Sequence, residues 1–312
     1  MKKIFLFPGQ GSQFLGMGKS LVENFPLAKQ LFEEANDALR FDLRKICFDG
    51  PESDLKLTHN TQPAILTHSV AASRVLSAET GQKADFVAGH SLGEYSALVV
   101  SGVLNFADAV KLVNKRGQFM QEAVPVGTGA MAALIGAQEA NTKSLCEQAG
   151  KNSGKVCEMA NFNGGGQIVI SGHKEAVEEA VRLAGADTSY GIAKAVLLQV
   201  SAPFHCSLMK RAEEFMRPLV EATTLGTMKI SYIANIDAKN YSSTDGVKER
   251  LLRQICGSVH WEQSMQLLAS LEVTEALEVG PGKVLSGLMR RIDKNIKCRG
   301  MDSADDVKNF LG

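Results

Sequence analysis

The sequence lacks an excess of charge of either sign. Its 312 residues include 34 Lys and Arg and 34 Asp and Glu, so the formal net charge at pH 7 is zero. Proteins that bind nucleic acids or anionic membrane surfaces usually carry clustered positive charge. We therefore expect neither kind of partner, and any anionic ligand must be bound by a few well-placed cations.

Long hydrophobic runs and metal-binding patterns are also missing. No apolar stretch approaches the roughly 20 residues that a membrane-spanning helix needs. The start, MKKIFLFPGQ, has an apolar run that ends at Pro8 and is too short for the core of a secretory signal. The six cysteines are scattered, with neither a C-x-x-C pair nor a histidine spacing typical of zinc. We expect a cytoplasmic protein with reduced thiols, no metal and no cofactor.

The sequence does have enough apolar residues, 45% hydrophobic, for a large buried core. Strand-like and helix-like segments alternate at both ends of the chain. The expected strands are 2–7, 84–90, 274–280 and 296–301, and the expected helices are one from about 17, then 92–102, 106–124 and 281–292. Such alternation predicts an α/β fold with a parallel sheet.

The middle of the chain has a different order of elements. Strand and helix patterns follow as β-α-β-β-α-β over 129–198, which is typical of a ferredoxin-like unit. We therefore predict a discontinuous large subdomain, 1–128 and 199–312, with a small subdomain, 129–198, inserted into it. A cleft between two such lobes is the usual place for a ligand.

The stretch VAGHSLGEYSALVVSG contains G-x-S-x-G, from Gly89 to Gly93. A strand pattern precedes it and a helix pattern follows, which is the context of a nucleophile elbow. In that interpretation Ser91 is the nucleophile, and the backbone N–H of Leu92 is a donor to the oxyanion. The alternative is that Ser91 only caps the helix.

A serine nucleophile needs a base, and His205 is the best placed of the six histidines. It lies in QVSAPFHCSLMK, after a strand and before a helix, where open α/β folds build their sites. No carboxylate between Ser91 and His205 stands out as a triad member, which argues against an ordinary α/β-hydrolase. The Gly-rich turn FPGQGSQF fits neither a dinucleotide fingerprint nor a P-loop. It leaves the backbone amide of Gln10 as a donor to a ligand.

Five segments together resemble a known family. In order they are FPGQGSQFLGMG, GHSLGEYSAL, KLVNKRGQFMQEA, QVSAPFHCSLM and EVGPGKVLSGL, and the resemblance covers about 3–300. They look like malonyl-CoA:acyl carrier protein transacylases of fatty acid synthesis. The resemblance implies an α/β-hydrolase-like core with a ferredoxin-like insertion. It also implies transfer of malonyl from malonyl-CoA to the phosphopantetheine thiol of acyl carrier protein, by a protein that we expect to be a monomer.

The resemblance also implies a role for each matching residue. Ser91 would be acylated, His205 would be its base and later the acid, and the amides of Gln10 and Leu92 would form the oxyanion hole. Arg116 would hold the free carboxylate of the malonyl group, because a guanidinium can meet a carboxylate with two parallel hydrogen bonds.

The remaining roles concern residues around this centre. The main-chain carbonyl of Gln254 would orient His205, and Gln62 and Asn163 would line the site. Ser258 stands where the family commonly has proline, which leaves the loop near Gln254 free to differ. Phe204, beside the proposed base, is at a position that shapes acyl choice in the family.

Several alternatives stay open at this point. Lys194 and Lys210 are candidates for binding CoA phosphates or an acidic carrier protein, or are simply solvated. The same site would serve an acyltransferase acting in trans for a polyketide synthase. A serine thioesterase would keep Ser91 and His205 but release acid to water, and a binding module with a degenerate elbow would form no adduct.

Overall fold

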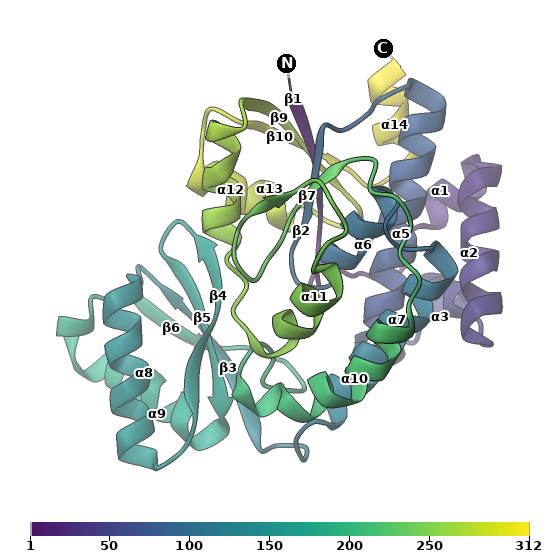
Figure 1. Ribbon diagram of the computed structural model, residues 1–312. Helices are drawn as coiled ribbons and strands as arrows, with labels where there is room; N and C mark the ends of the chain where they lie inside the picture. Colours follow the sequence, from purple (N-terminus) through teal and green to yellow (C-terminus); the bar gives the residue numbers. More distant parts are fainter. Residues whose placement is uncertain (1, 312) are drawn as a thin grey trace.

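The computed structural model describes residues 2–311, which form two sheets with helices around them (Figure 1). The larger sheet has the strand order β10-β9-β1-β2-β7-β8 and the smaller one β4-β5-β3-β6. The strands of the larger sheet are β1 (Lys2–Phe7), β2 (Phe86–Gly89), β7 (Ser231–Ile233), β8 (Asn240–Tyr241), β9 (Val273–Val279) and β10 (Lys297–Met301). Those of the smaller sheet are β3 (Gly129–Ile135), β4 (Cys157–Gly164), β5 (Gln167–His173) and β6 (Lys194–Leu197).

The larger sheet is mixed but mainly parallel. Strand β1 pairs in parallel with β2 on one side and with β9 on the other. On their far sides, β2 pairs in parallel with β7 and β9 with β10. The edge strand β8 runs antiparallel to β7, which corrects the expectation of a purely parallel sheet. Two residues are too few to leave a periodic pattern in the sequence, so this edge could not be predicted.

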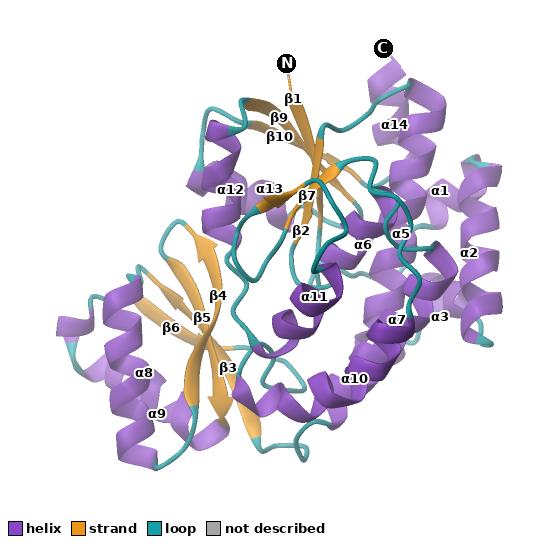
Figure 2. Ribbon diagram, in the orientation of Figure 1, coloured by secondary structure: helices purple, strands orange, loops and turns teal. Residues whose placement is uncertain are grey.

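Helices cover both faces of the larger sheet (Figure 2). The helices outside the segment 129–197 are α1 (Lys19–Asn24), α2 (Pro26–Leu39), α3 (Leu43–Asp49), α4 (Glu52–Lys56), α5 (Thr58–Thr80), α6 (Gly93–Val100), α7 (Phe106–Glu122), η2 (Ser207–Met209), α10 (Lys210–Ala222), α11 (Val247–Cys256), α12 (Trp261–Ser270), α13 (Val284–Ile292) and α14 (Ala304–Leu311). Residues 4–7 of the central strand β1 are buried on both faces, as is usual for a parallel sheet of this kind.

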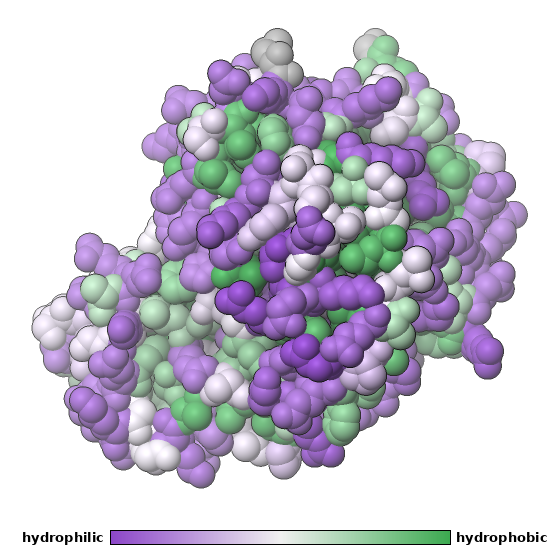
Figure 3. Space-filling model, viewed as in Figure 1, coloured by the Kyte–Doolittle hydropathy of each residue, from purple (hydrophilic) through white to green (hydrophobic). Residues whose placement is uncertain are grey.

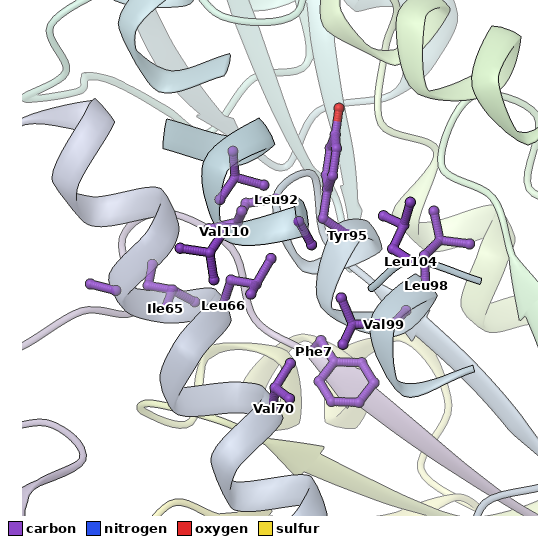
Figure 4. Close-up of a cluster of buried hydrophobic side chains, with 14 of the residues drawn as sticks. Phe7, Ile65, Leu66, Val70, Leu92, Tyr95, Leu98, Val99, Leu104 and Val110 are labelled. Carbon is purple, nitrogen blue, oxygen red and sulfur yellow. The ribbon is translucent and has the colours of Figure 1, made fainter. Parts of the chain in front are cut away.

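The side chains of β1 alternate between two cores. Phe5 and Phe7 pack in one cluster with residues of α2, α5, α6 and α7, whereas Ile4 and Leu6 pack in another with α12 and α13. This follows from the period of two along a strand. Figure 4 shows part of the first cluster, where Phe7 lies beside Val70 of α5 and Val99 of α6.

The smaller sheet projects from the rest of the molecule in Figure 1. Its strands pair antiparallel, and α8 (Glu139–Ser153), α9 (Lys174–Ala186) and the short η1 (Thr188–Tyr190) complete the segment. Leu134 and Ile170 face α8 and α9 in a core of their own. Met131 and Val169 belong to the main core cluster instead, so the other face of this sheet meets the rest of the protein.

The exposed surface in Figure 3 is mostly polar, and the cysteines are unpaired, as the sequence predicts. The face in Figure 3 is mostly hydrophilic, with hydrophobic side chains in separate small groups. All six cysteines are free. Over residues 2–311, no helix combines the length and the apolar character required to cross a bilayer.

Candidate active site

Ser91 lies on the sharp turn between β2 and α6, with a positive φ of 50°. A non-glycine residue in this region is uncommon and is often found at functional sites. The flanking glycines are required by close packing. A Cβ on Gly89 would lie 1.9 Å from the carbonyl carbon of Gly93, and one on Gly93 would lie 2.0 Å from the carbonyl oxygen of Phe7. The turn is therefore an elbow that only this glycine spacing allows.

A buried asparagine in the turn after another strand holds the elbow in place. Asn235 follows β7, and its Oδ1 accepts the backbone N–H of Ser91 at 2.7 Å. Its Nδ2 donates to the carbonyl oxygen of Gly89, also at 2.7 Å. Both bonds are to main-chain atoms of the turn, so a side chain from a distant part of the sequence fixes the conformation of the elbow.

His205 lies within hydrogen-bond distance of the serine. Its Nε2 is 2.7 Å from Ser91 Oγ, and its Nδ1 is 2.8 Å from the carbonyl oxygen of Gln254. Because a carbonyl oxygen can only accept, Nδ1 carries the proton and Nε2 is left to accept the serine hydroxyl. A main-chain carbonyl thus orients the base where a triad would use a carboxylate. His205 has a positive φ as well, of 58°.

His205 is buried and kept neutral. Burial, followed by the charge of Arg116, lowers the pKa of His205 from its ordinary value to about 3. A neutral imidazole can accept the serine proton at physiological pH. The imidazole is therefore in the protonation state that a general base needs.

Arg116 lies beside the same pair, on α7, and is 1% exposed. Its Nη2 donates to Ser91 Oγ at 3.1 Å and to Gln254 Oε1 at 2.9 Å, and its Nη1 donates to Gln62 Oε1 at 2.9 Å. Its Nε–H has no acceptor among the residues described. All of these partners are uncharged, and none of the salt bridges formed within residues 2–311 includes this arginine. A buried guanidinium without an anion is a ready binding site for a carboxylate.

Two backbone amides near the serine are free to donate. Neither the N–H of Gln10, in the turn after β1, nor that of Leu92 has an acceptor within the described part of the chain. Both residues line the same cavity as Ser91. Leu92 is also the N-cap of α6, where the helix dipole favours negative charge. The pair can stabilise an oxyanion.

A cavity of about 970 Å³ joins these groups. Its lining outside the segment 129–197 includes Gln10, Ser91, Leu92, Arg116 and His205, and the smaller sheet contributes a wall with Met131, Asn161, Asn163 and Val169. Lys56, Lys283 and Arg291 also line it. Together, these groups can carry out acyl transfer to and from a serine in a cavity large enough for a substrate of the size of a thioester arm.

Comparisons with known proteins place this arrangement in a family. Residues 4–286 match the family model described as "Acyl transferase domain". A malonyl CoA-acyl carrier protein transacylase of Bacillus subtilis (strain 168) is 44% identical over 309 residues, covering 99% of this chain and 96% of the relative. The chain belongs to the acyl transferase family, and within it to the malonyl CoA-acyl carrier protein transacylases.

Solved structures of this family have the same fold. An acyl-carrier-protein S-malonyltransferase from Bartonella henselae aligns with a TM-score of 0.94 and 43% identity, covering 100% of this chain and 98% of the other. A malonyl-transacylase solved in complex with a type II polyketide synthase acyl-carrier protein aligns with a TM-score of 0.95 and 40% identity. That alignment covers 100% of this chain and 99% of the other.

The structure brings the predicted site residues of this acyl transferase together. The group consists of Ser91, His205, Gln10, Leu92, Arg116, Gln62, Asn163 and Gln254. Asn163, on β4, bonds through its Oδ1 to Nε2 of His90 at 2.8 Å. Phe204 lines the cavity beside the base.

The loop around Ser258, which stands where the resemblance implies proline, is held by hydrogen bonds to β4. Ser258 Oγ donates to the carbonyl oxygen of Met159 at 2.7 Å, and the next residue, Val259, donates its N–H to Ala160 at 2.9 Å. These bonds tie the loop to β4. The carbonyl of Gln254 stays within hydrogen-bond distance of His205.

Lys194 and Lys210 lie outside the cavity lining, and Lys210 forms an ion pair with Glu213 at 2.9 Å, so a contact of either lysine with CoA phosphates or a carrier protein stays a prediction. One other sequence-based interpretation needs correction. His205 follows β6, which belongs to the smaller antiparallel sheet, so it does not lie at the end of a parallel strand. It comes to the serine on the segment that returns from the smaller sheet to α10.

Sequence reasoning missed Asn235 and Glu94. Asn235 stands in an ordinary-looking turn, and Glu94 looks like a helix-surface carboxylate but is only 1% exposed. The position of Glu94 three residues after Ser91, in the first turn of α6, was the only signal that could have drawn attention to it.

Proposed function

We propose that this chain transfers a malonyl group from malonyl-CoA to the phosphopantetheine thiol of an acyl carrier protein, through an acyl-enzyme on Ser91. Such transfer supplies extender units for fatty acid synthesis. The observation that carries the proposal is the buried Arg116, which has no anionic partner and donates to the oxygen of the serine nucleophile. The names of the relatives support the same activity.

The first half-reaction acylates the serine. Ser91 Oγ attacks the thioester carbonyl as its proton passes to His205 Nε2, and the N–H groups of Gln10 and Leu92 stabilise the oxyanion. The C–S bond then breaks, and the CoA sulfur leaves with the proton from His205. In the second half-reaction the carrier thiol gives its proton to His205 and attacks the ester. Ser91 is regenerated as it takes that proton back.

Arg116 gives the site its acyl preference in this proposal. A malonyl group carries a carboxylate and an acetyl group does not. The guanidinium can leave the serine oxygen and meet the carboxylate with two parallel hydrogen bonds, while Gln62 and Gln254 hold its plane. An acyl group without a charge would leave the buried cation unpaired, which costs several kcal/mol.

The finer description of the fold is also a proposal. The order β3-α8-β4-β5-α9-β6 and the sheet order β4-β5-β3-β6 support a ferredoxin-like small subdomain over 129–198. The larger, mainly parallel sheet with the Ser91 elbow supports an α/β-hydrolase-like large subdomain over 1–128 and 199–312. The steps above use only side chains and amides of this chain, so we propose that no cofactor takes part. The six free cysteines support a cytoplasmic location.

A second candidate differs only in the carrier protein. One relative of known structure is a malonyl-transacylase in complex with a type II polyketide synthase acyl-carrier protein. The same site would serve such a carrier, because the acyl half-reaction is identical. Transfer assays with holo carrier proteins of both kinds separate the two candidates.

Intact mass spectrometry after brief exposure to malonyl-CoA, and separately to acetyl-CoA, tests the proposal. We expect a malonyl adduct on the unmodified protein, none on Ser91→Ala, and roughly 100-fold slower formation on Arg116→Ala. Equal acetyl and malonyl adducts would contradict the role of Arg116. An adduct lost to water as fast as it forms would favour a thioesterase, and no adduct on a folded sample would leave Ser91 as a helix cap.

A further inference from the structure

The side-chain amide of Gln254 bonds to Arg116, Ser91 and Glu94. Its oxygen and its nitrogen can therefore be placed in only one orientation. Its Oε1 accepts from Arg116 Nη2 at 2.9 Å, and its Nε2 donates to the carbonyl oxygen of Ser91 at 2.9 Å. If the amide flipped, its NH₂ would face a guanidinium and its oxygen would face a carbonyl. Two donors, or two acceptors, would then be opposed in a fully buried place.

Glu94 supplies the strongest contact that sets this orientation. Its Oε2 accepts from Gln254 Nε2 at 2.7 Å and from the backbone N–H of Asn235 at 3.1 Å. Glu94 lies in the first turn of α6, three residues after Ser91, and donates its backbone N–H to the carbonyl of Ser91 at 3.1 Å. Because both partners of Oε2 are N–H donors, this oxygen accepts whether the carboxyl is ionised or protonated.

The amide also keeps a carboxyl and a guanidinium apart. Glu94 and Arg116 are each 1% exposed and bond to opposite ends of the Gln254 amide. A direct ion pair between them would consume the cation that the acyl carboxylate needs. The other charged groups near Glu94 are Arg250 on α11 and Asp237 after β7, and burial raises the pKa of Glu94 to about 7.

We propose that Glu94 is a positioning residue, which acts through Gln254 to hold Arg116 facing the nucleophile and unpaired, ready for an acyl carboxylate. This inference rests on the proposed function. Glu94 touches no substrate, and its effect should appear only for acyl donors that carry a negative charge.

The test compares two acyl donors on one protein. Glu94→Met removes the acceptor at similar volume. We expect acylation of Ser91 by malonyl-CoA to slow roughly 10- to 100-fold. Acylation by p-nitrophenyl acetate, which has no carboxylate, should stay within about threefold. Glu94→Gln keeps an acceptor oxygen in the same place, so it should restore the malonyl rate to within about threefold of the unmodified protein.

Two controls separate positioning from general damage. Glu278 is another buried carboxyl, which accepts the N–H groups of Leu285 and Ser286, and Glu278→Met should leave the ratio of the two rates unchanged. In an Arg116→Ala background, Glu94→Met should have no further effect on the malonyl rate beyond about threefold. If Glu94→Met does not fold, Glu94→Asp, which is too short to reach Gln254, should give the same selective loss.

An equal fall in both rates for Glu94→Met, or an unchanged malonyl rate, would overturn the inference. So would a further loss in the Arg116→Ala background. Failure of the proposed function would look different, because the unmodified protein would then form no malonyl adduct at all.

Discussion

The segments that carry Ser91 and His205 share a strained backbone but are held by different means. Both residues have positive φ, 50° for the serine and 58° for the histidine. The serine turn is fixed by Asn235 and by backbone packing at Gly89 and Gly93, which is too close to leave room for a Cβ atom. The histidine is fixed by burial and by the hydrogen bonds of its ring to the Gln254 carbonyl and the Ser91 hydroxyl. The conformation of the elbow therefore depends on close backbone packing in the fold, whereas the position of the base depends on contacts of its own side chain.

Breaking the elbow should have the largest effect, on stability as well as activity. In Gly93→Ala the new Cβ would lie 2.0 Å from the Phe7 carbonyl oxygen. We expect the free energy of unfolding to fall by about 3 kcal/mol or more, measured by urea denaturation. Gly185 on α9 has nothing within 4 Å of its Cβ position, so Gly185→Ala should stabilise by about 0.5 to 1 kcal/mol. A Gly93→Ala protein as stable as the unmodified one would contradict the comparison.

Removing the base should harm chemistry far more than folding. We expect His205→Ala to slow acylation of Ser91 by malonyl-CoA roughly 1000-fold, because the proton has no acceptor. Its free energy of unfolding should fall by only about 2 kcal/mol, since the hydrogen bonds to the Ser91 hydroxyl and the Gln254 carbonyl are lost. His260, which stacks on Phe162 at 5.0 Å between ring centres, is the matched control. His260→Ala should acylate at nearly the unmodified rate, and an equal loss in both variants would refute the assignment.

The support of the elbow from Asn235 can be measured separately. Asn235→Ala leaves the Ser91 N–H and the Gly89 carbonyl without their partners. We expect a loss of about 2 to 3 kcal/mol in the free energy of unfolding. Hydrogen exchange at the Ser91 amide should speed up more than exchange in the smaller sheet. Unchanged protection at Ser91 would show that the glycines alone hold the turn.

The smallest expected effect is a shift in pH dependence. A histidine with its ordinary pKa would lose half of its base form near pH 6.5. Because burial and Arg116 lower the pKa of His205 to about 3, acylation by p-nitrophenyl acetate should stay nearly constant from pH 8 down to about pH 5. In Arg116→Gln the acidic limb should move toward higher pH, because one cause of the lowering is gone. A limb near pH 6.5 in the unmodified protein would contradict a buried neutral base.

Local patterns were enough to predict the elbow and the order of elements. The two glycines around Ser91 lie within five consecutive positions, and residues 4–7 of β1 are a continuous apolar run, so both leave a signal in a short window. The resemblance supplied the roles of Arg116 and Gln254, which no local pattern gives.

The rest of the site depends on contacts between distant parts of the chain. Asn235 is 144 residues from the serine that it holds, and Gln254 is 160 residues from Glu94. No periodicity connects such pairs, because only the folded sheet brings them together. The cations lining the cavity, such as Lys56 and Arg291, were missed for the same reason.

The smaller sheet contributes a wall to the cavity but none of the groups that react. Ser91, Arg116, His205 and Gln254 all lie outside the segment 129–197, whereas Met131 and Val169 face the substrate space from within it. The residues that react and the residues that form this wall of the cavity are thus encoded in separate stretches of the gene. We expect exchange of the wall alone, for instance Met131→Ala with Val169→Ala, to admit bulkier acyl-CoA esters while ester formation from malonyl-CoA stays intact. Competition between malonyl-CoA and a branched homologue would measure this.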